Sequence, residues 1–371
     1  MKIGIITFQQ SKNYGGVLQA YALYTRLKQL GHSVEMVDYW PTYRDSMQFK
    51  FPKNFWKLSI IRKTKAVIRY ILTIRSLNVR HKRFENFALK HFNLKASPMY
   101  KNGNQIEEHF DVCIYGSDQI WRNYQLDDFK GIDETYFGVY PKNCSLKITY
   151  AASMGEINHD NNTVQKIGEL LSNFNNISVR ESSLKLFLKT NYEIDSSLVC
   201  DPTFLLSKKD WMDIIPSTQR KIKKKYILFY HLMPSKLGLE VALNIAKKYN
   251  CDLIEIPQKP LKTILGVKIA RTAGPTEFLE LIRDAEFVVT TSFHGIAFSI
   301  ILEKQFYGLG MGQKSDRALT ALKTLNLTDR YIYDSEEINL AKNIDFINVN
   351  KKLDLYKNNS LSFLLDNITK K

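Results

Sequence analysis

Phe287-Val-Val-Thr-Thr-Ser-Phe-His-Gly-Ile-Ala-Phe-Ser-Ile-Ile301 joins a β-branched strand to an apolar helix with no loop between them. The strand ends in hydroxyl side chains up to Ser292, and the helix opens with His294 and Gly295. A strand that passes directly into a helix is typical of parallel α/β sheets, where the helix leads back to the next strand. The segment therefore predicts an α/β fold with His294 at the carboxyl edge of a sheet.

His294 is a candidate functional residue because of this position. The free backbone N–H groups and the dipole of a helix N-terminus favour a bound anion. An imidazole both donates and accepts protons, so His294 is a candidate general acid or base. The neighbouring residues Ser292, Phe293 and Gly295 are candidates for substrate contact. A histidine buried for purely structural reasons is the alternative.

Strands and helices alternate on both sides of this segment. Strands are expected at 3–8, 33–39, 111–115, 147–151, 176–180, 226–231, 252–256, 287–291 and 305–308. Helices are expected at 17–30, 237–248, 275–285, 295–302 and 353–368. The stretch 207–225 is polar and rich in lysine, which makes it the best candidate for a linker.

This order of elements predicts two Rossmann-like domains that face a cleft. The first comprises residues 1–206 and carries a basic helical insertion at 52–95. The second comprises residues 226–335, and the tail at 336–371 is expected to pack back on the first domain. A chain of 371 residues is long enough for two hydrophobic cores, which agrees with this division.

Composition narrows the class of protein further. The sequence is 44% hydrophobic and 24% charged, as in ordinary globular proteins. It has no run of about 18 apolar residues and no signal-peptide pattern at its start, so we expect a cytoplasmic protein. Its four cysteines show no CxxC spacing, and no DxD, HxH or HExxH array occurs, so neither a disulfide framework nor a metal site is indicated.

The formal net charge of +16 points to an anionic partner. Residues 55–92 contain ten Lys or Arg and one Glu, interleaved with apolar side chains. This pattern is typical of a basic amphipathic helical pair that rests on an anionic membrane surface. The alternative is a pair of helices packed on their own domain with a solvated basic face. Nucleic acid is not an expected partner, because no zinc-finger spacing or RNP-type aromatic pattern is present.

Two further motifs follow strands of the first predicted domain. Asn13-Tyr14-Gly15-Gly16 precedes a helix, where free backbone N–H groups could bind an anion, although a glycine pair also simply closes turns. Gly116-Ser117-Asp118-Gln119-Ile120-Trp121 presents short polar groups suited to sugar hydroxyls. For Trp121 a role as a core anchor is favoured slightly over stacking on a sugar.

Charged residues complete the set of candidates. Arg180 follows a short apolar strand in Ser178-Val-Arg-Glu181 and could bind a carboxylate or phosphate through two parallel hydrogen bonds, or simply pair with a neighbouring acid. Lys314 and Arg317 follow a later strand at the same expected edge. Asp201 ends the last strand of the first domain and is expected to shape the cleft.

Taken together, these motifs resemble the polysaccharide pyruvyl transferase family over residues 1 to about 330. The resemblance rests on their order along the chain: Asn13-Tyr-Gly-Gly-Val-Leu-Gln-Ala20, Gly116-Ser-Asp-Gln-Ile-Trp121, Tyr150-Ala-Ala-Ser153, Ser178-Val-Arg-Glu181, Asp201-Pro-Thr203 and Ser292-Phe-His-Gly295. It implies a GT-B-like fold and a role in making a cell-surface polysaccharide, such as an exopolysaccharide or capsule, or its lipid-linked precursor.

The resemblance also implies the reaction. A pyruvyl group would move from phosphoenolpyruvate to two hydroxyls of a glycan sugar as a cyclic ketal, with release of phosphate and no further cofactor. The family's arginine matches Arg180, its histidine matches His294, and a basic residue about twenty positions later is matched loosely by Lys314.

The residues suggest how such a site would work. We expect Arg180, Lys314 and the amides near Gly295 to bind the anionic donor, while His294 moves the proton. The acceptor would lie against Ser117, Asp118 and residues 13–16, and a lipid-linked acceptor would explain the basic segment. A nucleotide-sugar glycosyltransferase of GT-B fold and a non-catalytic glycan- or lipid-binding protein remain the alternatives.

Overall fold

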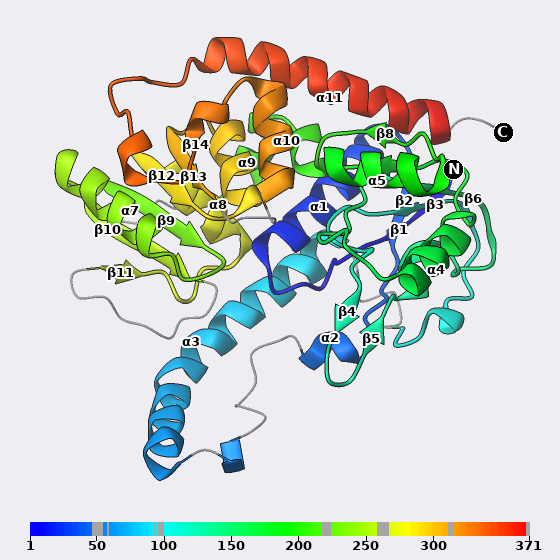
Figure 1. Cartoon of the computed structure of the whole chain (residues 1–371), viewed down its shortest axis with the longest axis horizontal. Coiled ribbons are helices and arrows are strands. Elements are labelled where there is room, and N and C mark those ends of the chain that lie inside the picture. Colours follow the sequence, from blue (N-terminus) through cyan, green and yellow to red (C-terminus); the bar gives the residue numbers. More distant parts are fainter. Residues whose placement is uncertain are drawn as a thin grey trace.

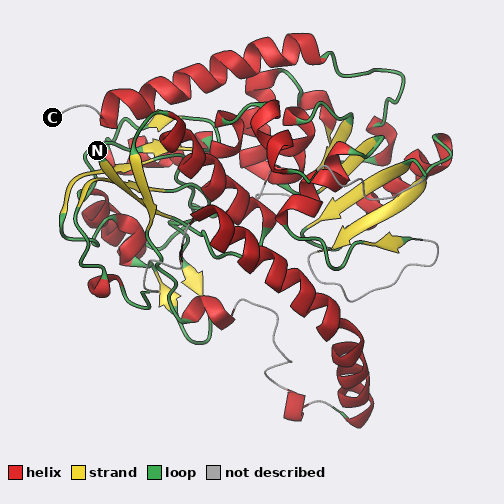
Figure 2. Ribbon diagram, turned by 180° about the vertical axis from the view of Figure 1, so that it is seen from behind, coloured by secondary structure: helices red, strands yellow, loops and turns green. Residues whose placement is uncertain are grey.

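The computed structural model describes residues 1–46, 55–57, 59–92, 94, 100–216, 224–257, 267–310 and 315–368. Two parallel sheets organise these residues, with helices packed around both (Figure 1). Figure 2 shows the same arrangement from behind. The sheets confirm the α/β class that the sequence predicted.

The first sheet has the strand order β2-β1-β3-β6, and all its neighbours pair in parallel. Its strands are β1 (Lys2–Ile6), β2 (Ser33–Met36), β3 (Phe110–Tyr115) and β6 (Cys144–Thr149). Single bridges beyond β6 continue toward the short parallel pair β7 (Ser178–Val179) and β8 (Ser197–Leu198). A small antiparallel hairpin lies outside the sheet, formed by β4 (Tyr124–Gln125) and β5 (Lys130–Gly131).

The second sheet has the order β11-β10-β9-β12-β13-β14 and is also parallel throughout. Its strands are β9 (Tyr226–His231), β10 (Asp252–Pro257), β11 (Lys268–Ile269), β12 (Phe287–Thr290), β13 (Phe306–Leu309) and β14 (Tyr331–Ile332). Strands β9 and β12 are buried along their whole length, as expected of a sheet covered by helices on both faces.

Helices supply the connections between these strands. They are α1 (Tyr14–Gln29), α2 (Tyr43–Ser46), α3 (Ile60–Phe92), α4 (Asn161–Leu171), α5 (Ser182–Tyr192), α6 (Lys208–Ile214), α7 (Lys236–Lys248), α8 (Pro275–Arg283), α9 (Phe293–Ile301), α10 (Asp316–Leu325) and α11 (Phe346–Ile368). Short 3-10 turns, including Pro202–Leu205, complete the described chain.

Helix α1 begins three residues earlier than the sequence predicted. The side chain of Asn13 accepts a hydrogen bond from the backbone N–H of Gly15 at 2.9 Å and caps the helix. This cap lets Tyr14, Gly15 and Gly16 form the first helical turn, although they had been expected to form a loop. The N-terminal N–H groups of α1 consequently point toward the carboxyl edge of the first sheet.

The basic segment forms one continuous helix, and the expectation of a helical pair is wrong. Helix α3 runs for 33 residues without a break, because the sequence from Ile60 to Phe92 contains neither Pro nor Gly. Its C-terminal part packs against the body of the protein, whereas its first turns lean away from it (Figures 1 and 2).

The predicted linker is partly helical. Residues Lys208–Ile214 form α6, in which Trp211 is fully buried and donates its indole N–H to the backbone oxygen of Thr203 at 3.1 Å. The lysine-rich residues 217–223 lie outside the described part of the chain.

One cluster of buried apolar side chains runs through both sheets. Ile5 of β1, Leu228 of β9 and Leu364 of α11 all belong to it. Helix α11 lies across the two parts of the molecule, and Ser360 accepts a hydrogen bond from the backbone N–H of Cys200 at 2.8 Å (Figure 1). The two sheets are therefore joined by shared apolar packing as well as by the chain.

The described residues contain neither a membrane-spanning helix nor a cluster of metal-ligating side chains. None of their helices is both long enough and apolar enough to cross a membrane. No group of three or more His, Cys, Asp or Glu side chains among them could hold a metal ion.

Candidate active site

Each sheet has a point where its strand order reverses, and ligands of open α/β sheets bind at such points. In the first sheet the reversal lies between β1 and β3, and in the second between β9 and β12. Gly15 follows β1, Asp118 follows β3 and His294 follows β12. The topology alone therefore places three of the predicted site residues at the edges where a ligand would bind.

The two edges meet at the contact between Gly15 and His294. A Cβ atom built on Gly15 would lie 2.0 Å from Nδ1 of His294, which is far inside van der Waals contact. Gly16 sits beside Asp118 in the same way, because its Cβ would lie 3.6 Å from a carboxylate oxygen of Asp118. The glycine pair thus lets the N-terminus of α1 approach the second sheet closely.

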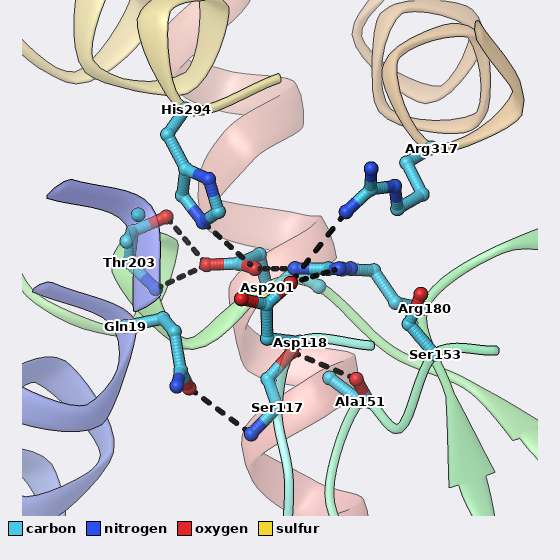
Figure 3. Close-up of polar contacts among 12 residues, drawn as sticks. Gln19, Ser117, Asp118, Ala151, Ser153, Arg180, Asp201, Thr203, His294 and Arg317 are labelled. Atoms are coloured by element: carbon cyan, nitrogen blue, oxygen red, sulfur yellow. Dashed lines mark hydrogen bonds and ion pairs between the residues drawn. The ribbon is translucent and has the colours of Figure 1, made fainter. Parts of the chain in front are cut away.

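Six charged or titratable side chains gather at this meeting point, and we call them the charged cluster. They are Asp118, Arg180, Glu181, Asp201, His294 and Arg317. Figure 3 labels all of them except Glu181. Figure 3 shows the ring of His294 pointing down from α9 toward Asp201, while Arg317 reaches in from α10.

Arg180 lies at the centre of the charged cluster and is 1% exposed. One terminal nitrogen pairs with Oδ2 of Asp201, and the other lies 3.4 Å from Oδ1 of Asp118. Its guanidinium also lies 5.2 Å from the centroid of the Phe293 ring. Burial alone would lower the pKa of Arg180, but Asp201 and Asp118 outweigh it and raise that pKa, so the guanidinium stays charged.

Asp201 links Arg180 to His294. Its Oδ1 accepts hydrogen bonds from the backbone N–H and the hydroxyl of Thr203 at 3.0 and 2.8 Å. Its Oδ2 pairs with Arg180 and lies 3.6 Å from Nε2 of His294. Burial tends to raise the pKa of Asp201, but His294 and Arg180 outweigh burial and hold that pKa well below its usual range. The carboxylate is therefore fixed and ionised.

Asp118 and Arg317 form the more accessible side of the charged cluster. Nη1 of Arg317 lies 3.6 Å from Oδ1 of Asp118, and the Arg317 side chain is 19% exposed. Burial and then the like charge of Arg180 lower the pKa of Arg317. Burial tends to raise the pKa of Asp118, yet Arg180 and Arg317 lower it overall. A bound anion beside Arg317 would relieve the repulsion between the two guanidinium groups.

Three buried polar atoms of the charged cluster have no hydrogen-bond partner among the described residues. They are Nε2 of His294, Nε of Arg180 and Oε2 of Glu181. Buried polar atoms are nearly always paired, so a group of exceptions marks a place where a polar ligand can bind. The carboxyl group of Glu181 is also poorly compensated within the protein, because burial raises its pKa despite the nearby Arg180.

The helix that carries His294 has an unusual N-terminus. Ser292 occupies the N-cap position of α9, but its hydroxyl caps no backbone N–H and has no hydrogen-bond partner among the described residues. A Cβ on Gly295 would lie 2.2 Å from the hydroxyl oxygen of Thr290, so only glycine fits the first turn against β12. The N–H groups of this turn consequently lie beside the charged cluster without a side-chain cap.

Other predicted site residues hold the structure together. Tyr14 is buried, stacks on Phe278 with ring centroids 4.3 Å apart, and donates its hydroxyl to the backbone oxygen of Ala273 at 2.7 Å. Ser117 is fully buried and donates its hydroxyl to the backbone oxygen of Ala151 at 2.7 Å. Asn13 caps α1, as described above. The hydroxyls of Tyr14 and Ser117 and the side-chain oxygen of Asn13 are thus engaged within the protein.

Gln119 and Trp121 follow Asp118 and differ from each other. Gln119 is partly exposed and lies against Gly155. Trp121 is fully buried, stacks on Phe137 with centroids 5.2 Å apart, and donates its indole N–H to the backbone oxygen of Tyr136. The structure therefore gives Trp121 the role of core anchor that the sequence favoured.

The sequence underestimated two residues of the charged cluster. From the sequence, Asp201 is expected only to shape the cleft between the domains. Arg317 is expected at the same sheet edge as Lys314, without a role of its own. Asp201-Pro-Thr203 carries the signal of a helix cap, since an aspartate followed by proline begins a helical turn, but its approach to His294 is a contact across 93 positions. Lys314 itself lies outside the described residues.

A hollow of about 650 Å³ lies elsewhere, beside the β4–β5 hairpin. Tyr39, Tyr43, Phe129 and Asp133 are among the residues that line it, and none of its lining residues belongs to the charged cluster. The residues that line this hollow include neither histidine nor arginine, so the charged cluster is the better candidate for the active site.

The fold defines a class of protein, an α/β enzyme of GT-B-like architecture, and the candidate site lies where its two parallel sheets meet. The chain belongs to the polysaccharide pyruvyl transferase family, whose family model matches residues 13–312. This match covers the motifs from Asn13 to His294 and indicates a transferase enzyme. Among curated proteins, none matches the chain.

Several solved structures are similar to the chain at low sequence identity. The chain is similar to UDP-GlcNAc 2-epimerase from Neisseria meningitidis, with 11% identity, a TM-score of 0.51 and full coverage of both chains. A putative UDP-N-acetylglucosamine 2-epimerase from Listeria monocytogenes has 9% identity and a TM-score of 0.49, with 98% of this chain and 94% of that chain covered. The E. coli heptosyltransferase WaaC has 10% identity and a TM-score of 0.37, with coverage of 83% and 88%. At 11% identity the likeness to the Neisseria meningitidis enzyme concerns the fold alone.

Proposed function

We propose that the protein transfers a pyruvyl group from phosphoenolpyruvate to a sugar of a cell-surface polysaccharide, or of its lipid-linked precursor, as a cyclic ketal. The observation that carries this proposal is the position of His294. Its Nε2 is buried at the N-terminus of α9 and faces the other residues of the charged cluster. It has no hydrogen-bond partner among the described residues. Membership of the family supports the same reaction class.

The donor combines a carboxylate and a phosphate in one small molecule, so its site needs fixed positive charge. Arg317 and the N–H groups at the start of α9 can supply that charge, and Lys314 remains a candidate from its place in the sequence. Arg180 was predicted to bind the donor directly, but both of its terminal nitrogens contact carboxylates. We assign Arg180 the task of positioning Asp201 and Asp118.

His294 is assigned as the general acid. In the first step it donates a proton to the methylene carbon of the donor, while a sugar hydroxyl adds to the neighbouring carbon and releases its own proton to water, from which His294 is protonated again. In the second step another hydroxyl of the same sugar adds to that carbon, and the carbon–oxygen bond to phosphate breaks. Phosphate leaves with the second hydroxyl's proton, so the products are the ketal and inorganic phosphate. Asp201 holds the imidazole near this carbon.

The acceptor sugar is assigned to the side of Asp118 and Gln119, which is the first sheet's contribution to the site. Asp118 is ionised and accepts hydrogen bonds, as a carboxylate that orients sugar hydroxyls must. We place the enzyme in the cytoplasm, where phosphoenolpyruvate is available, and give it no further cofactor.

A phosphate-release assay tests the proposal against its rivals. Purified protein is incubated with phosphoenolpyruvate and a panel of lipid-linked or nitrophenyl sugars, and in parallel with nucleotide sugars and the same acceptors. The proposal predicts acceptor-dependent phosphate release from phosphoenolpyruvate. Release of nucleotide without any phosphate from phosphoenolpyruvate would establish a glycosyltransferase, and binding of glycans without any turnover would establish a binding protein.

A further inference from the structure

Helix α3 consists of two parts with different surroundings. The inner part packs on the body through the buried side chains of Leu77, Phe84, Phe87, Ala88 and Phe92. Arg80 donates to the backbone oxygen of Pro257 at 3.3 Å, and Arg83 pairs with Glu277 at 3.1 Å. The sequence alternative of a basic helix packed on its own protein therefore holds for this inner part.

The outer part carries large apolar side chains that the protein leaves uncovered. We define the outer stripe as Trp56, Ile60, Ile61, Val67, Ile68 and Ile71. Trp56 is 82% exposed, Ile60 is 81% exposed and Ile71 is 64% exposed. These values differ sharply from those of the inner part of the same helix.

The members of the outer stripe that belong to α3 lie on one side of the helix, and Trp56 precedes them in the 3-10 turn Phe55–Lys57. Ile60, Val67, Ile68 and Ile71 follow one another at i, i+7, i+8 and i+11, which places them along a single face. Thr73 and Leu77, which are buried against the body, lie on the opposite face. The outer stripe therefore points away from the protein, and both views show its end of α3 at a distance from the sheets (Figures 1 and 2).

Charge decides which partner would cover this face. The sequence from Phe55 to Phe84 contains no acidic residue, whereas cations such as Arg62, Lys63, Arg75 and Lys82 accompany the apolar side chains. Two copies of this helix would repel each other, and the net charge of +16 adds to that repulsion. An anionic lipid surface attracts the cations and accepts the apolar side chains below its head groups.

We propose that the outer part of α3 docks the protein on an anionic phospholipid bilayer, with the outer stripe inserted at the head-group boundary. This proposal goes beyond the reaction proposed above and does not depend on it. The helix would lie in the interface without crossing the bilayer, in keeping with its many charges.

The inner part of the same helix connects such docking to the active site. Arg80 lies over the ring of Tyr14, with its guanidinium carbon 4.9 Å from the ring centroid. Tyr14 immediately precedes Gly15, which contacts His294. Helix α3 would therefore link the docked end of the protein, through Arg80 and Tyr14, to the end of α1 that reaches the active site.

Tryptophan fluorescence tests the docking directly. Of the four tryptophans, Trp56 alone is exposed, since Trp40, Trp121 and Trp211 are buried. Vesicles of phosphatidylcholine with phosphatidylglycerol should shift the emission of the full-length protein to shorter wavelength at low salt, and the protein should float with them. Vesicles of phosphatidylcholine alone should do neither, and Trp56→Phe should abolish the shift while leaving flotation in place.

Matched variants separate the apolar and the charged contributions. Ile60→Ser with Ile68→Ser should weaken vesicle binding by on the order of tenfold for each side chain. Ile347→Ser with Leu355→Ser removes two exposed side chains at the same spacing on α11 and should leave binding unchanged. Arg62→Gln and Arg75→Gln should each weaken binding by about fivefold, whereas Lys247→Gln and Lys248→Gln on α7 should not.

Three results would overturn the docking proposal. The first is the absence of flotation and of any spectral shift with anionic vesicles at low salt. The second is equal binding to both kinds of vesicle, which would remove the role of charge. The third is a protein that does not bind vesicles but forms a dimer, detected by sedimentation, which the Ile60→Ser and Ile68→Ser pair dissociates. Phosphate release from phosphoenolpyruvate, measured on the same samples with a water-soluble acceptor, reports on the reaction separately.

Discussion

At the scale of single residues, His294 differs from an ordinary buried histidine because Nε2 faces Asp201 at 3.6 Å without a hydrogen bond. We predict that His294→Ala lowers kcat by at least about 100-fold, as expected for loss of a general acid. Its free energy of unfolding should fall by only about 1 to 2 kcal/mol. Steady-state kinetics and urea denaturation measure the two effects, and loss of folding in this variant would favour a structural histidine instead.

Arg317 should affect donor binding more than the chemical step. Arg317→Gln removes a charge-assisted contact to the donor, so we predict that KM for the donor rises about tenfold or more while kcat changes little. Arg317→Lys keeps the charge and should show a smaller rise. Kinetics with varied donor concentration distinguish the two variants, and an unchanged KM in Arg317→Gln would show that Arg317 does not contact the donor.

Asp201 should make the protein sensitive to acid. Its pKa is held below the usual value in the folded state, so its stabilising contribution is complete above the unfolded pKa of about 3.9 and is lost as pH falls through the folded pKa. Asp201→Asn lacks that contribution and leaves Arg180 buried with one carboxylate fewer. We predict a loss of roughly 3 to 5 kcal/mol at pH 7, and a difference from wild type that shrinks below about pH 4.

Denaturation at a series of pH values checks this prediction. Asp195→Asn is the control, because the Asp195 side chain is 80% exposed and its ion pair with Lys185 spans 3.8 Å. That variant should remain within about 0.5 kcal/mol of wild type at every pH. A difference between Asp201→Asn and wild type that stays constant from pH 7 to pH 3 would contradict the assignment.

At the scale of elements, the first turn of α1 brings the two edges of the site together. We predict that Gly15→Ala abolishes most activity, because its Cβ would lie 2.0 Å from Nδ1 of His294 and would displace the imidazole. Gly168→Ala is the matched control, since Gly168 also lies in a helix but contacts the ring of Tyr192 away from the site. Activity measurements on both variants decide the point, and full activity in Gly15→Ala would mean that the imidazole has room to move.

The sequence predicted elements best where the hydrophobic pattern was strong. The buried strands β9 and β12 were expected within one residue of their ends, because runs such as Phe287-Val-Val-Thr290 have little alternative to a covered strand. Helix α1 was predicted to start too late, although Asn13 is a good N-cap and could have revealed its first residue. The single helix α3 was missed because 33 residues is well beyond the usual helix length.

The candidate site could be predicted only in part, for a physical reason. Gly15, Asp118 and His294 were found because each follows a strand at a sheet edge, which local sequence reveals. The pairing of Arg180 with Asp201 and Asp118 was not found, since it depends on contacts between residues far apart in the chain. Local sequence likewise could not show that Tyr14 and Ser117 use their hydroxyls within the protein.

At the scale of the whole molecule, the two sheets share one apolar cluster and a hydrogen bond from Tyr14 to the backbone oxygen of Ala273. We predict that they unfold in a single transition. Tyr14→Phe should lower the free energy of unfolding by about 1 to 3 kcal/mol, because the variant leaves a buried carbonyl without its partner. Calorimetry of both proteins measures this, and two separate transitions in the wild type would show that the sheets fold independently.

In the proposed reaction, the enzyme forms a pyruvyl ketal on a sugar while a proton is delivered to the donor carbon. Mass spectrometry of the acceptor, after incubation with phosphoenolpyruvate in ordinary and in heavy water, tests it most directly. The acceptor should gain the mass of one pyruvate less one water, and in heavy water the new methyl group should carry one deuterium. An acceptor panel that gains no such mass from phosphoenolpyruvate, while a nucleotide sugar glycosylates one of its members, would contradict it.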